Sequence, residues 1–457
     1  MGARSDDELS YGSILRLVWP LAIGMINVAA MQFADRAYLA HYSMSALEAV
    51  LPASMLASVF MAFFQSVVGY SNVFVAQYYG AGDVKRCRAS YQVAMWLAAI
   101  SGLLMAAFVP LGGLIFTKTA SSVELVAMEK EYYDIVILGG FFAYGQMAAS
   151  SYFTGRGRTR LVFWVNLLGN LLNVALDPIL IYGFDIGGVS LPSMGIRGAA
   201  YATVISQAVQ FVVLAAAAWS PETPVRFPDG YLLRRMIRFG IPAGGYEVLN
   251  MLSFTIFVFV TGTVGEVEFA ASNACFAINY LLFAPMLGFA LGAQTLVGRF
   301  CGRSDHAGAI VACRRTLALG LTFIAIVAVL VLTFHGAILS IFAPGDIALG
   351  ADFTSLGLKL LVIMAAWMFF DALDTILSGA LKGAGDTRFV FWWMLITAFV
   401  LWMPTIYFAK LYFGSMTALW ATMVIYVVAI CIGSVIRWRR GKWKLHRLIS
   451  GKNKSLA

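Results

Sequence analysis

Long apolar segments alternate with short polar segments along the whole of this 457-residue chain. Most of the apolar segments exceed the ~20 residues that a helix needs to cross a bilayer, and they are too long for the strands of a membrane barrel. The pattern therefore predicts twelve membrane-spanning helices, at residues 13–40, 46–78, 88–117, 123–154, 160–183, 195–219, 232–263, 268–299, 307–343, 351–381, 388–411 and 415–437. The predicted fold is an all-α, multi-pass membrane protein.

The composition supports this prediction, because 61% of the residues are apolar and only 12% are charged. About a quarter of the residues are charged in an ordinary soluble domain, which could not cover so much apolar surface. Soluble enzymes, disulfide-rich scaffolds, disordered chains and nucleic-acid-binding modules are therefore excluded. The five cysteines and four histidines show no metal-binding spacing, so we expect neither a metal centre built from them nor a cofactor.

The formal net charge of +9 bears on membrane topology, since lysine and arginine concentrate on the cytoplasmic side of membrane proteins. Loops after even-numbered spans are basic, as at Arg156, Arg158 and Arg160, whereas loops after odd-numbered spans are acidic, as at Glu124. This distribution predicts a plasma-membrane protein, in the inner membrane if the source is bacterial, with both termini in the cytoplasm. The tail 437–454 has eight basic and no acidic residues, which predicts contact with anionic membrane lipids rather than with nucleic acid.

The two halves of the chain carry related sequences. Five residues of the first half recur 222 positions later: Arg16, Pro20, Val75, Gly80 and Asp83. Residues 155–164 also match residues 383–392 at seven of ten positions, at an offset of 228. Since each half holds six predicted spans, we expect two pseudo-symmetric six-helix lobes related by an axis along the membrane normal. The N-lobe would comprise residues 1–225 and the C-lobe residues 226–457.

Two acidic residues lie within predicted spans of the N-lobe, where an ionised side chain costs ~2.5–3.5 kcal/mol on insertion scales. Asp35 is late in the first span, Asp177 is within the fifth with Asn173 one turn before it, and Thr203 is on the sixth. If these helices meet, the four side chains form an oxygen-rich site for H⁺ or Na⁺, because two carboxylates in a low dielectric cannot both stay charged without sharing a cation. The alternative is that Asp35 pairs only with the adjacent Arg36.

The C-lobe also carries polar side chains within predicted spans: Glu247, Asn250, Asp371 and Asp374. Asp371 and Asp374 are three residues apart and so share one face of the tenth span. They predict a second site, for a cation or a substrate. The alternative interpretation is that they line a water-filled cavity or contact a neighbouring helix.

The chain resembles the multidrug and toxic compound extrusion (MATE) transporters over nearly its whole length. The resemblance rests on Pro20 with Asp35 fifteen residues later, on the Gly80–Asp83 loop and its repeat at Gly302–Asp305, on the two G-x-G-x-T-R loops, and on the N-x-x-x-D-P motif at Asn173–Pro178. It favours the DinF-like branch over the NorM-like branch. The resemblance implies twelve helices in two lobes that form a V-shaped cavity.

The resemblance also implies roles for residues of the N-lobe. The implied cation-coupling site comprises five side chains: Asp35, Tyr132, Asn173, Asp177 and Thr203. Pro20 is the implied hinge of the first helix. No metal is implied beyond a coupling Na⁺ at this site.

In the C-lobe, Asp371 stands where Na⁺-coupled members of the family carry an aspartate. The partner glutamate of those members falls eight residues after Pro242, where this chain has Asn250, and Glu247 lies one turn earlier. This difference favours coupling in the N-lobe.

The function implied by the resemblance is that of a monomeric secondary active antiporter. It would export amphipathic cations, such as drugs or toxic compounds, in exchange for external H⁺ or Na⁺. One alternative is a flippase for a lipid-linked or polysaccharide precursor, although acidic rather than basic residues lie within the spans. The other is a membrane-embedded enzyme, but the sequence shows no nucleophile–base pair and no catalytic metal motif.

Overall fold

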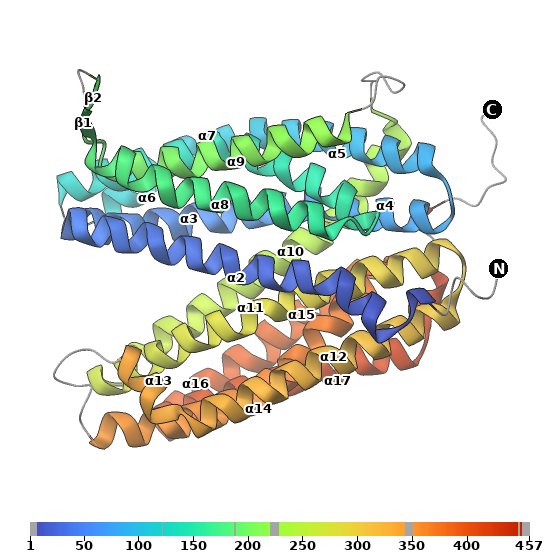
Figure 1. Cartoon of the computed structure of the whole chain (residues 1–457). Coiled ribbons are helices and arrows are strands. Elements are labelled where there is room, and N and C mark those ends of the chain that lie inside the picture. The colour runs from blue at the N-terminus through green and yellow to red at the C-terminus, as the bar shows by residue number, and fades with distance from the viewer. Residues whose placement is uncertain are drawn as a thin grey trace. The chain divides into compact units, whose positions relative to one another are not determined.

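The structure is a computed structural model that describes residues 7–120, 122–186, 189–219, 228–342, 351–446 and 448–449. Helices make up nearly all of this described part (Figure 1). The first half contains α2 (Tyr11–Tyr42), α3 (Met44–Gly69), α4 (Ser71–Gly80), α5 (Val84–Ala106), α6 (Val109–Thr119), α7 (Val123–Gly155), α8 (Thr159–Tyr182) and α9 (Ile196–Ala218). A small antiparallel hairpin of β1 (Phe184–Ile186) and β2 (Val189–Leu191) connects α8 with α9.

The second half is also helical. It contains α10 (Gly230–Thr261), α11 (Glu266–Gly302), α12 (His306–Thr333), α13 (His335–Phe342), α14 (Ala351–Ala384), α15 (Thr387–Ile396), the π-helix η2 (Thr397–Trp402), α16 (Met403–Tyr412), α17 (Met416–Arg439) and the 3₁₀-helix η3 (Lys442–Leu445).

The helices account for the predicted membrane spans. Within the described residues, eleven helical segments are long and apolar enough to cross a membrane. The segment α7 is not among them, although its 33 residues are long enough, and its N-terminal part carries acidic side chains such as Glu124, Glu129 and Asp134. With α7 these segments match the twelve predicted spans, so the all-α, multi-pass fold is confirmed.

Several predicted spans consist of more than one helix. The span predicted at 46–78 is divided at Tyr70 into α3 and α4. The span predicted at 388–411 runs from α15 through η2 into α16, which has Pro404 in its first turn. Proline has no amide hydrogen for the carbonyl one turn earlier, at Val400, so the wider π-turn lies where the regular helical pattern cannot continue.

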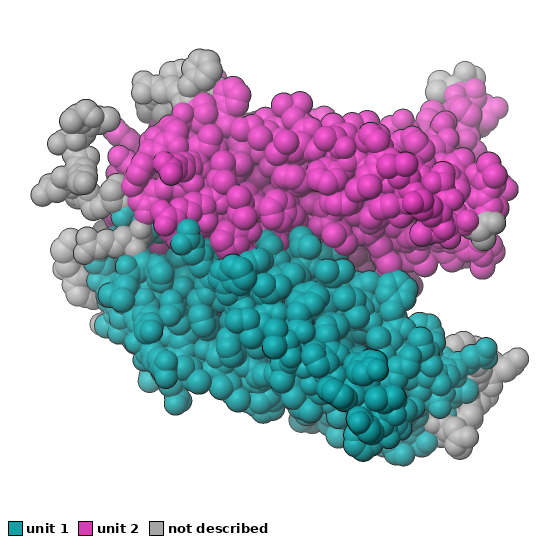
Figure 2. Space-filling view, turned by 180° about the vertical axis from the view of Figure 1, so that it is seen from behind, with its two compact units in different colours: residues 1–23, 245–457 teal, residues 24–244 magenta. Residues whose placement is uncertain are grey.

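The chain forms two compact units, shown in different colours in Figure 2. Unit 1 comprises residues 1–23 and 245–457, and unit 2 comprises residues 24–244. The helices α2 and α10 are therefore each divided between the units, a few residues after Pro20 and Pro242 respectively. The predicted boundary between residues 225 and 226 lies outside the described residues, so the division into lobes at that point stays a prediction.

In unit 1, the beginning of α2 packs against helices of the second half. Arg303 forms an ion pair with Glu8, with 2.7 Å between Nη1 and Oε2. Gly288 on α11 lies against the backbone of Ala22, and a Cβ atom at residue 288 would be only 2.4 Å from the Ala22 nitrogen. The absence of a side chain at Gly288 thus allows the two helices to meet backbone to backbone.

The helices α11 and α14 form a close pair in the interior of unit 1. Gly379 and Gly383 on α14 face the carbonyl oxygens of Ala290 and Gln294 on α11, and Cβ atoms at these glycines would lie 2.4 and 2.3 Å from those oxygens. The spacing of four residues on both helices is the G-x-x-x-G arrangement that permits close packing of membrane helices.

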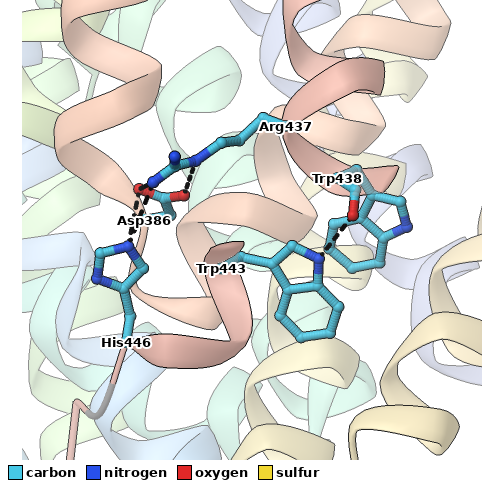
Figure 3. A network of polar contacts seen from close by, with 5 residues as sticks. All are labelled: Asp386, Arg437, Trp438, Trp443 and His446. Atoms are coloured by element: carbon cyan, nitrogen blue, oxygen red, sulfur yellow. Dashed lines mark hydrogen bonds and ion pairs between the residues drawn. The ribbon is translucent and has the colours of Figure 1, made fainter. Parts of the chain in front are cut away.

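The end of α17 and the segment after it fold back onto the loop between α14 and α15 (Figure 3). Asp386 in this loop is only 1% exposed. Arg437 donates two hydrogen bonds to its carboxylate, from Nε to Oδ2 at 2.6 Å and from Nη2 to Oδ1 at 3.1 Å. His446 Nε2 lies 3.2 Å from Oδ1. The Trp443 ring stacks on Trp438 and donates from its indole nitrogen to the Trp438 carbonyl, which fixes the start of the basic tail.

Candidate functional site

Unit 2 brings together the five residues predicted for the N-lobe site, with Thr203 taking part through its backbone amide. Asp35 lies on α2, Tyr132 on α7, Asn173 and Asp177 on α8, and Thr203 on α9. With its amide oriented to satisfy both neighbours, Asn173 donates from Nδ2 to Asp35 Oδ1 at 2.8 Å and accepts the Thr203 amide hydrogen at 3.3 Å. Tyr132 is close enough to both Asp35 and Asp177 to interact with them electrostatically.

The carboxyl groups of Asp35 and Asp177 lie next to each other. Asp177 is fully buried, and its oxygens accept no hydrogen bond from a donor among the described residues. The two carboxyl groups are close enough to form a hydrogen bond with each other. Because ionised carboxylates can only accept, that hydrogen bond requires a proton on one of them. Two adjacent carboxyl groups in this buried environment are therefore unfavourable when both are ionised.

The helix α8 places Asn173 and Asp177 on one face, since they are one turn apart. Pro178 follows within the same helix and has no amide hydrogen to donate to the Val174 carbonyl. That carbonyl is therefore an additional oxygen near the two polar side chains.

The simplest alternative for Asp35 was an ion pair with Arg36. Within the described part of the chain, no ion pair joins these two residues. Arg36 is exposed, whereas Asp35 is half-buried beside Asn173. Asp35 thus contacts the interior cluster rather than only its neighbour in the sequence.

The oxygen atoms of the cluster suit a hard cation. Carboxylate, amide and hydroxyl oxygens are typical ligands of such ions, and the carboxyl pair also binds protons. Among the described residues, no group of three or more His, Cys, Asp and Glu side chains is placed to hold a metal ion.

In unit 1, two of the polar residues predicted as a second site have side-chain partners in the protein. Glu247 forms an ion pair with Lys382, with 2.9 Å between Oε1 and Nζ. The Lys382 ammonium also lies 3.9 Å from the centre of the Tyr246 ring. Asp374 accepts a hydrogen bond from Ser378 at 3.3 Å. A protein cation thus already neutralises one of the three acids.

The remaining two residues of this second set take no part in that ion pair. Asp371 precedes Asp374 by three residues on α14, and the Asn250 side chain is exposed on α10. The Asn250 backbone carbonyl accepts a hydrogen bond from the Ser253 hydroxyl at 3.2 Å. Whether these residues bind a cation or a substrate stays a prediction.

Lys382 was not among the residues predicted from the sequence. The available signal was a basic residue near the end of a long apolar segment, where an ionised side chain needs a partner. Its partner Glu247 is 135 residues away in the chain, so the sequence could not show which acid it would meet.

A known family matches the chain in two segments that correspond to the internal repeat. Residues 20–179 and 242–408 match the model of the MatE family. The chain belongs to the MatE family. The two matched segments begin 222 residues apart, at Pro20 and Pro242, as the repeat predicts. The resemblance to MATE transporters is therefore confirmed.

Several relatives are similar over most of their length. A probable multidrug resistance protein NorM from Thermotoga maritima is 26% identical over 439 residues, covering 93% of this chain and 91% of its own. The multidrug resistance protein PmpM from Pseudomonas aeruginosa is 25% identical over 419 residues, covering 88% and 83%. These relatives are named as drug resistance proteins and not as enzymes, and the names do not favour the flippase alternative. They do not separate the DinF-like from the NorM-like branch.

Solved structures share the fold. An outward-facing multidrug resistance MATE family transporter of the MOP superfamily superimposes with a TM-score of 0.85 at 20% identity, covering 96% of this chain and 97% of the other. A MOP superfamily transporter from Pyrococcus furiosus gives a TM-score of 0.83 at 19% identity, with 96% and 97% covered. The chain thus has the helical fold of MATE transporters.

Proposed function

We propose that this MatE-family protein is a secondary active antiporter that exports amphipathic organic cations, including drugs, in exchange for H⁺ or Na⁺. The observation that carries the proposal is the pair of half-buried Asp35 and fully buried Asp177, with Asn173 hydrogen-bonded to Asp35. The multidrug resistance names of the relatives support the substrate class.

The coupling follows from the electrostatics of the pair. Two carboxylates in a low dielectric repel each other unless a cation binds between them or one is protonated. A cation therefore stabilises the arrangement in which the two groups are close. Exchange requires that the cation and the substrate prefer different conformations, since a ligand shifts an equilibrium only by its difference in affinity.

Pro20 is the point at which α2 can transmit this change. It has no amide hydrogen for the Arg16 carbonyl, so the helix is weakened there. Asp35 lies on the same helix, about 22 Å further along its axis. Cation binding at Asp35 can therefore change the bend of α2 at Pro20.

We further propose that the protein lies in the plasma membrane, the inner membrane in a bacterium, with both termini in the cytoplasm. The basic loop between α7 and α8 and the basic tail support this orientation. We also propose that the protein acts as a monomer without a cofactor.

The experiment that tests the function is export of tetraphenylphosphonium from proteoliposomes, with a pH gradient and a Na⁺ gradient imposed separately. The wild type should respond to one of the gradients. Asp35→Asn should lower gradient-driven export at least tenfold, because it removes one carboxylate of the pair while keeping its size. Asp185→Asn, at an exposed position in the β1–β2 hairpin, is the matched control and should export at the wild-type rate. Full export by Asp35→Asn would refute the proposed coupling site.

A further inference from the structure

A polar stripe continues from Asp177 along α8. Four side chains follow one another at spacings of four, three and four residues, which places them on one face of the helix: Asn166, Asn170, Asn173 and Asp177. The stripe covers about 16 Å of the helix axis. Asn170 is only 6% exposed and Asn173 is fully buried, so the stripe lies in the interior of unit 2.

The helix α9 carries a matching stripe of Thr203, Ser206 and Gln210, spaced by three and four residues. Gln210 Nε2 donates to Asn170 Oδ1 at 3.2 Å, and the Thr203 amide hydrogen reaches Asn173. The two helices therefore meet at both levels, through the Gln210 side chain at one and through the Thr203 backbone at the other, where the Thr203 hydroxyl donates to the Ala199 carbonyl of its own helix. Ser206 lies between these contacts along α9 and is buried.

The helix α7 extends the series beyond Asn170. Gln146 on α7 donates to Asn166 Oδ1 at 2.9 Å and to Ser150 Oγ at 3.1 Å. Gln146 and Asn166 are only half-buried. Polar side chains thus recur at successive levels of α8 from the acidic pair to a partly exposed amide pair, in the direction of the first residue of α8, Thr159.

Gly169 makes room for this arrangement. A Cβ atom at residue 169 would lie 2.2 Å from Gln210 Nε2 and 2.5 Å from Gln210 Cδ. Any side chain at this position would push the Gln210 amide away from Asn170. The contact between the stripes therefore depends on a glycine at this one level of α8.

Two polar atoms of the stripes have no protein partner in the part of the chain that the structure describes: Asn170 Nδ2 and Ser206 Oγ. Both side chains are more than nine-tenths buried. Buried polar atoms are normally satisfied, and water is the usual partner where the protein offers none. Amide oxygens can ligate Na⁺, and water held between amides and hydroxyls can pass a proton although the amides themselves do not titrate.

We propose that these facing stripes form the route by which the coupling cation leaves the Asp35–Asp177 pair. We call the route the amide track, comprising Asn166, Asn170 and Asn173 of α8, Ser206 and Gln210 of α9, and Gln146 of α7. It leads to the side of the membrane where α8 begins, which the proposed orientation places in the cytoplasm. The inference rests on the proposed antiport function and adds the residues that determine its rate.

The amide track differs in its consequences from a merely structural set of interhelical hydrogen bonds. A route affects how fast the cation moves but not how tightly the acidic pair holds it at equilibrium. A structural network affects folding, and through folding it affects binding and rate together. The test must therefore measure rate and equilibrium in the same variants.

The test variant is Asn170→Leu combined with Gln210→Met, which keeps the approximate volumes but removes the polar atoms at the centre of the track. The full-length protein is reconstituted in proteoliposomes with the gradient that drives the wild type. The rate of tetraphenylphosphonium export should fall at least tenfold. The dissociation constant of tetraphenylphosphonium, and its dependence on the coupling cation, should stay within twofold of the wild type.

The matched control is Gln92→Leu, which removes a half-buried amide from α5, outside the track. It should export at the wild-type rate. Asn170→Ser keeps a polar group at the centre of the track and should retain at least half the wild-type rate. If thermal unfolding shows that the double variant does not fold, Ser206→Val tests the same route and should slow export at least threefold.

Two results would overturn the amide track. One is a wild-type export rate in the folded double variant, or in Ser206→Val when that variant is the one tested. The other is a parallel loss of binding and rate, which indicates damage to packing. Both can occur while the wild type remains cation-driven and Asp35→Asn remains inactive, so a failure of the track is distinguishable from a failure of the proposed function.

Discussion

Two buried aspartates of this protein show how neighbouring groups determine whether a carboxyl group stays ionised. Asp177 is fully buried and lies beside another carboxyl group, so ionisation of both groups together is unfavourable. Asp386 is almost as buried but is held by Arg437 and His446. Burial alone raises the pKa of the Asp386 carboxyl, but the hydrogen bonds from His446 and Arg437 outweigh it and hold the pKa below the ordinary value of 3.8. Asp386 therefore stays ionised and acts as a fixed anchor.

The stability contributed by Asp386 should depend on pH in one direction. Its pKa is lower in the folded than in the unfolded protein, so its stabilisation is complete above the unfolded value and is lost as the pH falls through the folded value. Asp386→Asn should lower the free energy of unfolding by about 3 kcal/mol between pH 5 and 8, because it leaves the Arg437 guanidinium without its anionic partner. The difference should shrink below about pH 4.

The measurement is thermal unfolding of both proteins in detergent over this range of pH. Glu48→Gln, at an exposed position, serves as the control and should leave the melting temperature unchanged. A difference between wild type and Asp386→Asn that is the same at pH 3.5 and pH 7 would contradict the assignment.

The candidate site was predictable from the sequence at the level of single residues. Acidic and amide side chains inside apolar segments are rare, because burying them is expensive, and so Asp35, Asn173 and Asp177 stood out. The ion pair of Glu247 with Lys382 was not predictable. Which acid meets which base depends on the packing of helices distant in the sequence, and no local pattern encodes it.

At the scale of elements, the pair of α11 and α14 shows how backbone contact organises unit 1. The two glycines of α14 lie directly against carbonyl oxygens of α11. In a membrane, helices gain little from leaving lipid, so close van der Waals contact of this kind is a main source of their association. The position of α14 in turn fixes Asp371, Asp374 and Lys382, which lie on the same helix.

Gly383→Ala should separate this helix pair. The new Cβ atom would meet the Gln294 carbonyl oxygen at 2.3 Å, and a backbone atom cannot turn away as a side chain can. We expect a loss of about 1–3 kcal/mol in the free energy of unfolding, typical of overpacking. Gly336→Ala is the control, since no atom lies within 4 Å of a Cβ there, and it should unfold at the wild-type temperature or above. Equal melting temperatures for Gly383→Ala and the wild type would show that α11 and α14 are not held by this contact.

The helices themselves were predictable because some twenty consecutive apolar residues in a bilayer have one favourable conformation. The breaks within the spans were less predictable from the sequence. Neither the division of α3 from α4 at Tyr70 nor the π-helix η2 follows from an apolar pattern, since both preserve the span and change only its local winding. Proline at residue 404 was the one local signal for η2.

At the scale of the whole molecule, the charges of the loops are the basis for the proposed orientation of the protein in the membrane. Basic residues lie where α7 ends and α8 begins, at Arg156, Arg158 and Arg160. The opposite end of α7, where that helix begins, carries Glu124 and Glu131. Basic residues are retained on the cytoplasmic side during insertion. The orientation matters for function, because it decides which end of the amide track faces the cytoplasm.

Reporter fusions test this orientation. A green fluorescent protein fused to the C-terminus should fluoresce, because it folds in the cytoplasm, and alkaline phosphatase at the same place should be inactive. Phosphatase fused after Thr119, between α6 and α7, should be active. The reverse pattern of activities would place the termini on the outer side and would also reverse the direction of the amide track.

The division of α2 between the units has a consequence for biosynthesis. Residues 1–23 belong to unit 1, but α11, against which Ala22 packs, is made some 265 residues later. At ~5–20 residues per second, that delay amounts to roughly 13–50 s, during which the first turns of α2 have no permanent protein neighbour. Unit 2 can be completed from a continuous stretch of nascent chain, whereas unit 1 closes only when the last helices reach a segment that left the ribosome first.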